Sequence, residues 1–290
     1  MQTQPYYFGC PVWVCDAWVG SVYAGKSRER WLADYTHAFN AVEGNSTFYA
    51  LPTSDTVRRW AEEAAAGFRF VFKFPRTVTH EHQLVDAQRD TEAFTSLLAI
   101  LRRADRLGPS MIQLPPSFDG AKLPQLEAFL AQLPREFSYA VEVRHADYFG
   151  QGPVEQELEA MLAEYGVARV LFDSRPLFSA PPSDDFERES QGRKPRVPVR
   201  FATTNRSPVV RLVGRNDVSS VEPWLDDWVA VVADWLDRGI TPYFFTHAPN
   251  NAFAPAISAL FHAKLRQRVS ALPPLHPWPG QVVQRQQSLF

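Results

Sequence analysis

The chain has 290 residues, of which 45% are hydrophobic, and its 30 basic and 32 acidic side chains give a formal net charge of −2. A composition this apolar and this close to neutral excludes a disordered polypeptide, and it argues against a protein that coats nucleic acid or membranes through bulk charge. The length is compatible with two small domains or with one α/β barrel.

Short β-rich segments recur along the chain, and their first residues lie 28 to 41 residues apart. These predicted strands are residues 7–10, 41–43, 69–73, 110–114, 138–143, 168–172, 209–213 and 242–246. Helical periodicity fills most of the gaps, over residues 29–39, 54–65, 91–103, 123–133, 154–165, 221–236 and 254–269, with Ser54 as an expected helix cap. Such alternation predicts a parallel sheet with helical crossovers.

Eight strand–helix units predict an α/β protein of the (β/α)8 TIM-barrel type. An open doubly wound sheet is the alternative, but no G-x-G-x-x-G or Walker loop follows any predicted strand. We expect residues 1–270 to form a single barrel domain. Residues 174–208, rich in proline and mixed charge, are expected to form a long loop that replaces the sixth helix, and residues 271–290 an extended proline-rich tail.

Targeting and redox signals are sparse. No apolar run approaches the ~18 residues that a membrane helix needs, and the N-terminal residues lack the pattern of a secretory signal. The two cysteines, Cys10 and Cys15, make neither a disulfide framework nor a zinc motif. We therefore expect a cytoplasmic protein with reduced thiols and no membrane partner.

Charged and amide side chains lie at nearly every predicted strand end, which is where barrels of this class carry their chemistry. The set comprises Glu43, Asn45, Lys73, Gln113, Glu142, Arg144, Asp173, Arg211, Arg215 and His247. One interpretation is a ligand or active site at the barrel mouth. The alternative is a set of buried ion pairs that only lock the mouth, because an isolated buried charge is costly.

The residue types indicate an anionic ligand. Lys73, Arg144, Arg211 and Arg215 would bind phosphate or carboxylate oxygens through charge-assisted hydrogen bonds. The carboxyl groups would act as general acid or base if burial raises one pKa, or they would bind a divalent metal. We expect no metal or other cofactor, because the cationic side chains compete for the same carboxylates, and the His80-Glu81-His82 stretch is expected to be solvated.

Several motifs resemble those of the YecE-like family, domain of unknown function 72. The motifs are VEGNSTFYALP at residues 42–52, FKFPRTVTHEHQL at 72–84, IQLPPSF at 112–118, AVEVRHADYF at 140–149, VRLVGRND at 210–217 and NNAFAPAISAL at 250–260. The resemblance covers residues 8–265 and implies a TIM-type barrel, similar to the endonuclease IV and xylose isomerase group. That similarity of fold is an analogy and does not define a reaction.

The resemblance implies a set of site positions. They are Glu43, Asn45, Thr47, Tyr49, Lys73, Arg76, His80, Gln113, Glu142, Arg144, Asp173, Arg211 and Arg215. The chain departs from the family pattern at Val213, where many members have histidine, and at Phe245-Thr246-His247, where many have F-N-N. We expect His247 to take the place of the missing histidine from across the mouth.

Three hypotheses for the function follow from these residues. The first is an acid–base enzyme (a hydrolase, lyase or isomerase) that acts on a small anionic or phosphorylated substrate, with Glu43, Glu142 and Asp173 as catalytic groups. The second is a protein that binds or repairs nucleic acid, with Arg188, Arg193, Lys194, Arg196 and Arg200 as contacts. The third is a non-catalytic binding module. The substrate and the oligomeric state do not follow from the sequence.

Overall fold

A computed structural model describes residues 5–287, in which strands and helices alternate along the chain. The strands are β1 (Tyr7–Gly9), β2 (Ala41–Gly44), β3 (Arg69–Phe72), β4 (Ser110–Gln113), β5 (Tyr139–Glu142), β6 (Ala168–Asp173), β7 (Val209–Val213) and β8 (Tyr243–His247). The predicted strands agree with these bounds to within one residue at each end, because each strand is a buried apolar run that ends at polar or turn-forming residues.

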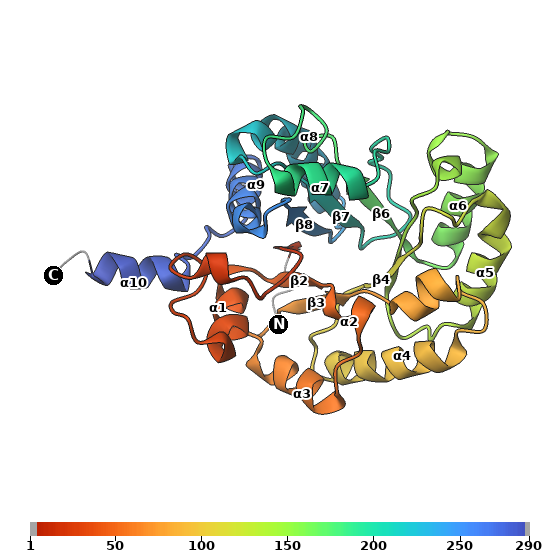
Figure 1. Cartoon of the computed structure of the whole chain (residues 1–290), viewed down its shortest axis with the longest axis horizontal. Helices are drawn as coiled ribbons and strands as arrows, with labels where there is room; N and C mark the ends of the chain where they lie inside the picture. The colour runs from red at the N-terminus through yellow and green to blue at the C-terminus, as the bar shows by residue number, and fades with distance from the viewer. Residues whose placement is uncertain (1–4, 288–290) are drawn as a thin grey trace.

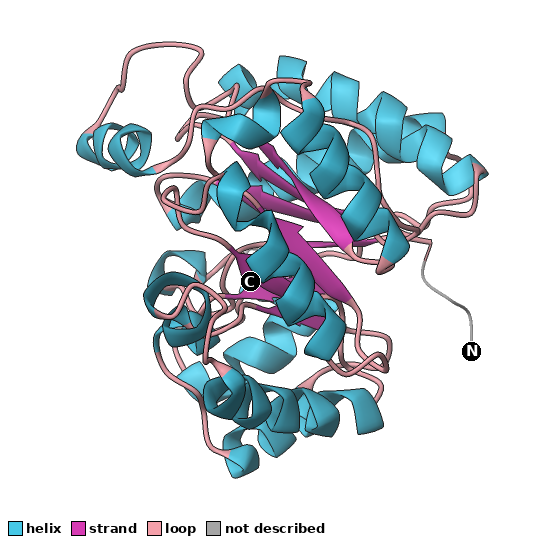
Figure 2. Cartoon of the chain, turned by 90° about the vertical axis from the view of Figure 1, so that its right-hand side faces the viewer, coloured by secondary structure: helices cyan, strands magenta, loops and turns pink. Residues whose placement is uncertain are grey.

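Helices follow the strands and lie on the outside of the sheet, as Figure 2 shows. They are α1 (Trp31–Ala38), α2 (Ser46–Tyr49), α3 (Ser54–Glu63), α4 (Gln88–Arg103), α5 (Leu123–Gln132), α6 (Pro153–Glu164), α7 (Asp185–Arg193), α8 (Val218–Asp237), α9 (Ala254–Arg268) and α10 (Pro279–Gln287). The cap of α3 is Thr53 rather than the predicted Ser54, since the Thr53 hydroxyl accepts the Thr56 N–H. None of the helices described is long and apolar enough to cross a bilayer.

All paired strands are parallel. Six of them form a curved half-barrel in the order β1-β8-β7-β6-β5-β4, and β2 pairs with β3 in a second, two-stranded sheet. Main-chain hydrogen bonds connect this pair to both edges of the larger sheet. Glu43 N–H donates to Cys10 O (3.1 Å) beside β1, and Phe74 N–H donates to Met111 O (2.9 Å) in β4.

The strands bury side chains on both of their faces. The larger apolar cluster lies between the sheets and the surrounding helices. A second cluster contains residues from every one of the eight strands, namely Tyr7, Ala41, Val71, Met111, Ala140, Ala168, Val170, Val209, Tyr243 and Phe245. Because successive side chains of a strand point to opposite faces, this second cluster marks the inner face of the curved sheet.

The segment between β6 and β7 differs from its prediction, because residues 174–208 contain helix α7 rather than loop alone. Asp184 caps the helix by accepting the Glu187 N–H (2.7 Å). The Glu187 side chain is buried, and its carboxylate accepts hydrogen bonds from Arg215 (2.7 Å) and from Asn216 N–H (2.9 Å). The helix is held by polar contacts, and apolar periodicity therefore could not reveal it.

The C-terminal segment also differs from the extended tail that was expected. Residues 279–287 form α10, which extends away from the body of the molecule in Figure 1. A proline at the start of a helix loses no hydrogen bond, because the first N–H groups have no partner inside the helix. Trp278 is buried beside Phe39 and fixes the beginning of α10. Residues 288–290 of the predicted tail lie outside the described residues.

At Gly9 the backbone of β1 lies very close to that of β2. A Cβ atom added at Gly9 would lie 1.9 Å from Ala41 O, so Gly9→Ala must push the two strands apart. We expect Gly9→Ala to lower the free energy of unfolding by about 3 kcal/mol, as overpacking of a tight interior does. The measurement is urea unfolding followed by circular dichroism. Gly150→Ala is the control, because nothing lies within 4 Å of its added Cβ; equal stabilities of the two variants would contradict the close approach.

Candidate functional site

A lattice of buried ion pairs lies at the C-terminal ends of the strands, with Arg211 of β7 at its centre. The Arg211 guanidinium donates to Glu43 of β2 through Nε (2.7 Å to Oε2) and Nη2 (2.9 Å to Oε1). Its Nη1 donates to Glu142 Oε2 of β5. All three side chains are buried. One cation therefore connects strands from both sheets and binds two carboxylates, one from each sheet.

Further side chains share the same two carboxylates. Lys73, which follows β3, lies 3.2 Å from Glu43 Oε1 and donates to Gln113 Oε1 (3.1 Å). Arg144, which follows β5, donates through Nε to Glu142 Oε1 (2.7 Å). The lattice thus contains three cations, Lys73, Arg144 and Arg211, but only two carboxylates. One positive charge is left uncompensated within it.

The lattice keeps both carboxyl groups ionised. Burial alone would raise the pKa of Glu142, but the charges of Arg211, Arg144 and Lys73 outweigh burial and lower that pKa to about 2. The pKa of Glu43 is likewise held well below its usual value, because Arg211 and its other cationic neighbours outweigh burial. Neither group is held protonated at neutral pH, and neither therefore has the raised pKa that a role as general acid requires.

His247, the last residue of β8, joins the lattice as a neutral ring. Its Nε2 lies 2.9 Å from Glu43 Oε2. Burial lowers the pKa of His247 to about 4, and Arg211 and Lys194 act in the same direction, although Glu43 opposes them. Because an ionised carboxylate only accepts hydrogen bonds, Nε2 carries the proton and Nδ1 keeps a free lone pair.

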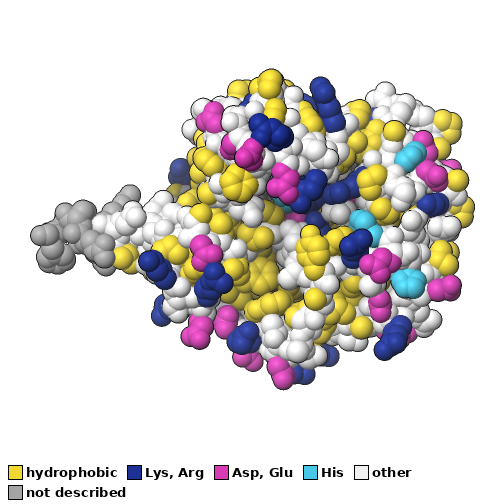
Figure 3. All heavy atoms as spheres, viewed as in Figure 1, with side chains coloured by type: hydrophobic (Ala, Val, Ile, Leu, Met, Phe, Trp, Pro, Cys, Tyr) yellow, Lys and Arg dark blue, Asp and Glu magenta, His cyan; other side chains and the backbone are white. Residues whose placement is uncertain are grey.

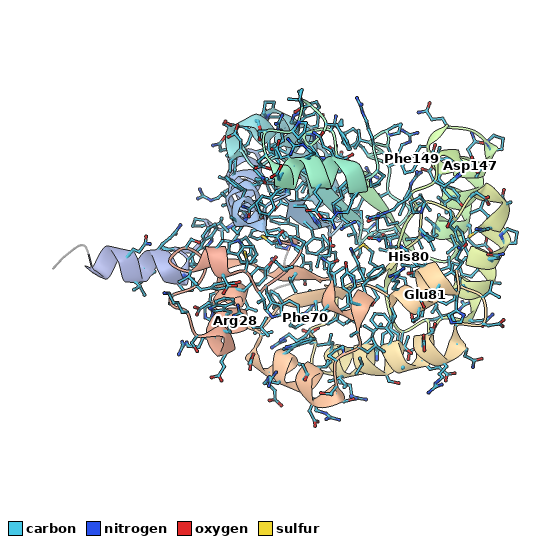
Figure 4. All side chains as sticks on the ribbon, in the orientation of Figure 1. Arg28, Phe70, His80, Glu81, Asp147 and Phe149 are labelled. Atoms are coloured by element: carbon cyan, nitrogen blue, oxygen red, sulfur yellow. The ribbon has the colours of Figure 1, made fainter. Side chains whose placement is uncertain are left out.

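A cavity of about 700 Å³ opens above the lattice. Cationic side chains dominate its charged lining, namely Lys73, Arg76, Arg144, Arg193, Lys194 and Arg211. The one carboxylate among the lining residues is Glu189, which is exposed and paired with Arg193 at 2.9 Å. In Figure 3, Lys and Arg side chains gather in the hollow below α7, with histidine beside them, and Figure 4 labels His80 there.

Lys194, which the sequence indicated only as a contact for nucleic acid, is one of the residues that line this cavity. It directly follows α7, and its N–H donates to Ser190 O (2.9 Å). Among the residues described, no carboxylate lies within 4 Å of its amine. Burial and the nearby charges of Arg211, Lys73 and Arg144 lower its pKa to about 7. The sequence assigned Lys194 only to a loop of mixed charge, because no sequence pattern indicates that this loop reaches the mouth.

Many of the predicted site residues do come together at this cavity. Those that line it are Asn45, Tyr49, Lys73, Arg76, His80, Gln113, Arg144, Arg211 and His247. Thr47 lies behind the wall, where its hydroxyl donates to Lys73 O (2.7 Å) and positions that residue. His80 lines the wall as a neutral ring, because burial and Arg144 lower its pKa to about 4. The stretch expected to be solvated thus contributes one side chain to the cavity.

Two predicted residues point elsewhere. The Asp173 carboxylate accepts hydrogen bonds from Trp228 Nε1 (2.8 Å) and Arg175 Nη2 (2.8 Å) and does not line the cavity. Its neighbour Phe172 faces Arg211, so strand alternation directs Asp173 toward α8. Arg215 also lies outside the cavity lining, because it pairs with Glu187 and anchors α7.

Val213 occupies the position at which the resemblance implied a histidine. It is buried, lines the cavity and packs with Phe172 and Leu177. His247 is its direct partner in the register of β7 and β8. His247 therefore lies beside Val213 on the neighbouring strand, rather than across the mouth as the sequence led us to expect. Within residues 5–287, no group of three or more His, Cys, Asp or Glu side chains is arranged to hold a metal ion.

These features define an α/β protein whose parallel strands end in a buried ion-pair lattice below a cation-lined cavity. The chain belongs to the family described as "Protein of unknown function DUF72", whose family model matches residues 7–281. The resemblance inferred from the sequence motifs is therefore confirmed for the family.

Relatives and solved structures agree with this assignment. The chain is 37% identical to UPF0759 protein YecE of Escherichia coli K12 over 284 residues, which cover 98% of this chain and 99% of that protein. It is 26% identical over 212 residues to UPF0759 protein YunF of Bacillus subtilis 168, covering 70% and 69% of the two chains. A DUF72 family structure from Thermotoga maritima shares the fold with a TM-score of 0.66 at 22% identity, covering 91% and 99%. A structure from Enterococcus faecalis has a TM-score of 0.63 at 17% identity, covering 85% and 96%.

The lattice makes stability depend on pH through Glu142. Because its folded pKa of about 2 lies below the ordinary 4.5, its contribution is complete above about pH 4.5 and is lost as the pH falls toward 2. We expect Glu142→Gln to cost about 3 kcal/mol of unfolding free energy near pH 7. The difference from wild type should shrink as the pH falls through that window, as measured by urea titration at several pH values. The exposed Glu127→Gln is the control, and a pH-independent difference for Glu142→Gln would contradict the assignment.

Proposed function

We propose that the eight strands close into one (β/α)8 barrel and that its mouth binds a small phosphate- or carboxylate-bearing molecule, on which the protein acts as an acid–base enzyme. Closure is supported by the main-chain hydrogen bonds that connect the β2–β3 pair to both edges of the larger sheet. It is also supported by the inner apolar cluster, to which all eight strands contribute. In such barrels the strand ends carry the chemistry.

The charge of the cavity is the observation that carries this proposal. The lattice retains one uncompensated positive charge, and Lys194 adds a second cationic group whenever it is protonated. An anion placed above Arg144 and Lys194 would neutralise both, in a cavity where partial burial strengthens charge-assisted hydrogen bonds. The Asn45 and Gln113 amides, which line the same cavity, would supply neutral donors. A volume of about 700 Å³ suits a small molecule.

His247 is our candidate for moving a proton. Glu43 holds Nε2–H, so Nδ1 is the acceptor. The charges of Arg211 and Lys194 help to lower the pKa of His247, and a bound anion would screen them. Binding of substrate therefore raises that pKa and makes the ring a better base. We assign no role to a metal ion, because the oxygens of Glu43 and Glu142 already accept hydrogen bonds from cationic side chains.

A second candidate function is the binding of single-stranded nucleic acid. The observation that favours it is the pair of aromatic rings at the rim of the cavity, Tyr49 (81% exposed) and Phe186 (53% exposed). Bases stack on such rings while cations bind the phosphates. The acidic residues Asp185 and Glu189 on α7 oppose a long polyanion. A small anion is therefore the first choice, and competition between a short oligonucleotide and sulfate distinguishes the two candidates.

Sulfate and phosphate are the probes for the anion site. We expect both to bind to the wild-type protein in isothermal titration calorimetry. Arg144→Ala should weaken binding at least about tenfold, because one charge-assisted contact is lost. The matched control is Arg28→Ala, since Arg28 pairs with Asp16 on another part of the surface, as Figure 4 shows. Absence of binding to the wild type, or equal affinities of the two variants, would overturn the proposal.

The protonation of Lys194 should be coupled to anion binding. Its pKa is about 7 in the free protein, and a bound dianion raises it, so binding takes up protons near pH 7.5 and weakens as the pH rises further. Sulfate is the suitable probe, because it does not itself titrate in this range. We expect the binding enthalpy to vary with the ionisation enthalpy of the buffer. Lys194→Arg should reduce that variation to the part contributed by Lys73, whose pKa of about 8 lies in the same range, and a buffer-independent enthalpy in the wild type would contradict the coupling.

A further inference from the structure

Lys194 differs from the other four lysines of the chain in its surroundings. Lys73 lies 3.2 Å from Glu43, and Lys264 pairs with Glu222 at 2.9 Å. Lys122 donates to Gln83 Oε1 (2.7 Å), and Lys26 is exposed. Lys194 is partly buried on the cavity wall, and no carboxylate within the described residues is close enough to pair with its amine.

The groups that face Lys194 come from several elements. They are Lys73 after β3, Arg144 after β5 and Arg211 on β7, with Glu43 on β2 as the opposing charge and His247 on β8 nearby. The positive charges predominate and, together with burial, favour the neutral amine. A neutral amine next to other cations is the arrangement that activates lysine as a nucleophile toward carbonyl groups.

The position of this amine is fixed by the helix that precedes it. Arg215 and Asn216 bind the buried Glu187 carboxylate and anchor α7. On the other side of Lys194, the Ser174 hydroxyl donates to Pro195 O (2.8 Å). The chain is therefore attached to the sheet on both sides of Lys194. A nucleophile held in this way needs little reorganisation to meet a bound substrate.

We propose that Lys194 forms an imine with an aldehyde or ketone carbonyl of the anionic substrate. This inference rests on the proposed function and names its substrate class: a carbonyl compound that also carries a phosphate or carboxylate. The neutral amine attacks the carbonyl carbon, a C–N bond forms, and the carbinolamine loses water to give the C=N bond. The amine protons and the carbonyl oxygen leave together as that water molecule, so no oxidant or reductant is needed.

The cations explain why the carbonyl compound must be anionic. The imine nitrogen then takes up a proton from solvent, and the protonated imine carries a positive charge into a cavity that already has an excess of positive charge. The phosphate or carboxylate of the substrate compensates for it, whereas a neutral aldehyde does not. The same groups that lower the pKa of Lys194 in the free protein thus select substrates that bring negative charge. Lyase and isomerase steps that begin at a carbonyl are the corresponding reaction class.

The probe for this inference is pyridoxal 5′-phosphate, an aldehyde that carries a phosphate, with cyanoborohydride as the reductant. The reductant delivers hydride to the imine carbon and leaves a stable secondary amine, which peptide mapping assigns to one of five lysines or to the N-terminal amine. We expect Lys194 to react at least about tenfold faster than Lys26, Lys122 or Lys264. Inorganic phosphate should slow this reaction, and pyridoxal without the phosphate should show a smaller preference for Lys194.

Lys194→Arg is the matched variant. It cannot form the imine but keeps a cation on the wall, so it should lose the fast adduct and bind phosphate within about threefold of the wild type. If the wild type binds phosphate but Lys194 reacts no faster than the exposed lysines, or if the adduct maps to Lys73, the imine inference is overturned and the anion site stands. If phosphate does not bind and Lys194 still reacts preferentially, the anion site and the anionic substrate class are overturned, and only the reactivity of the Lys194 amine toward carbonyl groups stands. If neither is observed, both fail.

Discussion

The contact between Arg211 and two carboxylates is the constraint on which the rest of the site depends. A buried guanidinium is tolerated only if its donors are satisfied, and here Glu43 and Glu142 satisfy them from opposite sides. This requirement holds the C-terminal ends of β2, β5 and β7 close together. Once the two carboxylates are fixed as anions, they in turn position Lys73 and Arg144. The cations of the cavity are thus placed by the same bonds that stabilise the strand ends.

A second buried ion pair has a different role. Arg215 and Glu187 hold α7 over the cavity, outside the lattice itself. The lattice shapes the floor of the cavity, and this second pair determines what covers it. The wall formed by α7 carries an aromatic ring, an exposed ion pair and the amine of Lys194. If the charges at the mouth only formed ion pairs that lock the strand ends together, the floor of the cavity would be explained. The presence of Lys194 and of the other groups on this wall would not be.

The strands and most helices could be predicted because each is an apolar run or a helical period bounded by turn-forming residues. The charged floor of the site was also predictable, since Glu43, Lys73, Glu142 and Arg211 interrupt apolar strands. The sequence did not reveal α7, because polar contacts made by residues distant in the chain stabilise it. Asp173 was assigned to the mouth because it ends a strand. Its neighbour Phe172 occupies the inner face of that strand, so Asp173 lies on the opposite face, toward α8.

The separation of floor and wall has a consequence for how such proteins diverge. The lattice is built from residues in the strands or directly after them, and their loss would unbalance several buried charges at once, so it tolerates little change. The nine residues of α7 and the residue after it are attached at a few polar points and can be exchanged without disturbing those charges. Selection can therefore alter the chemistry presented to a ligand through one short, replaceable segment while the scaffold beneath stays the same.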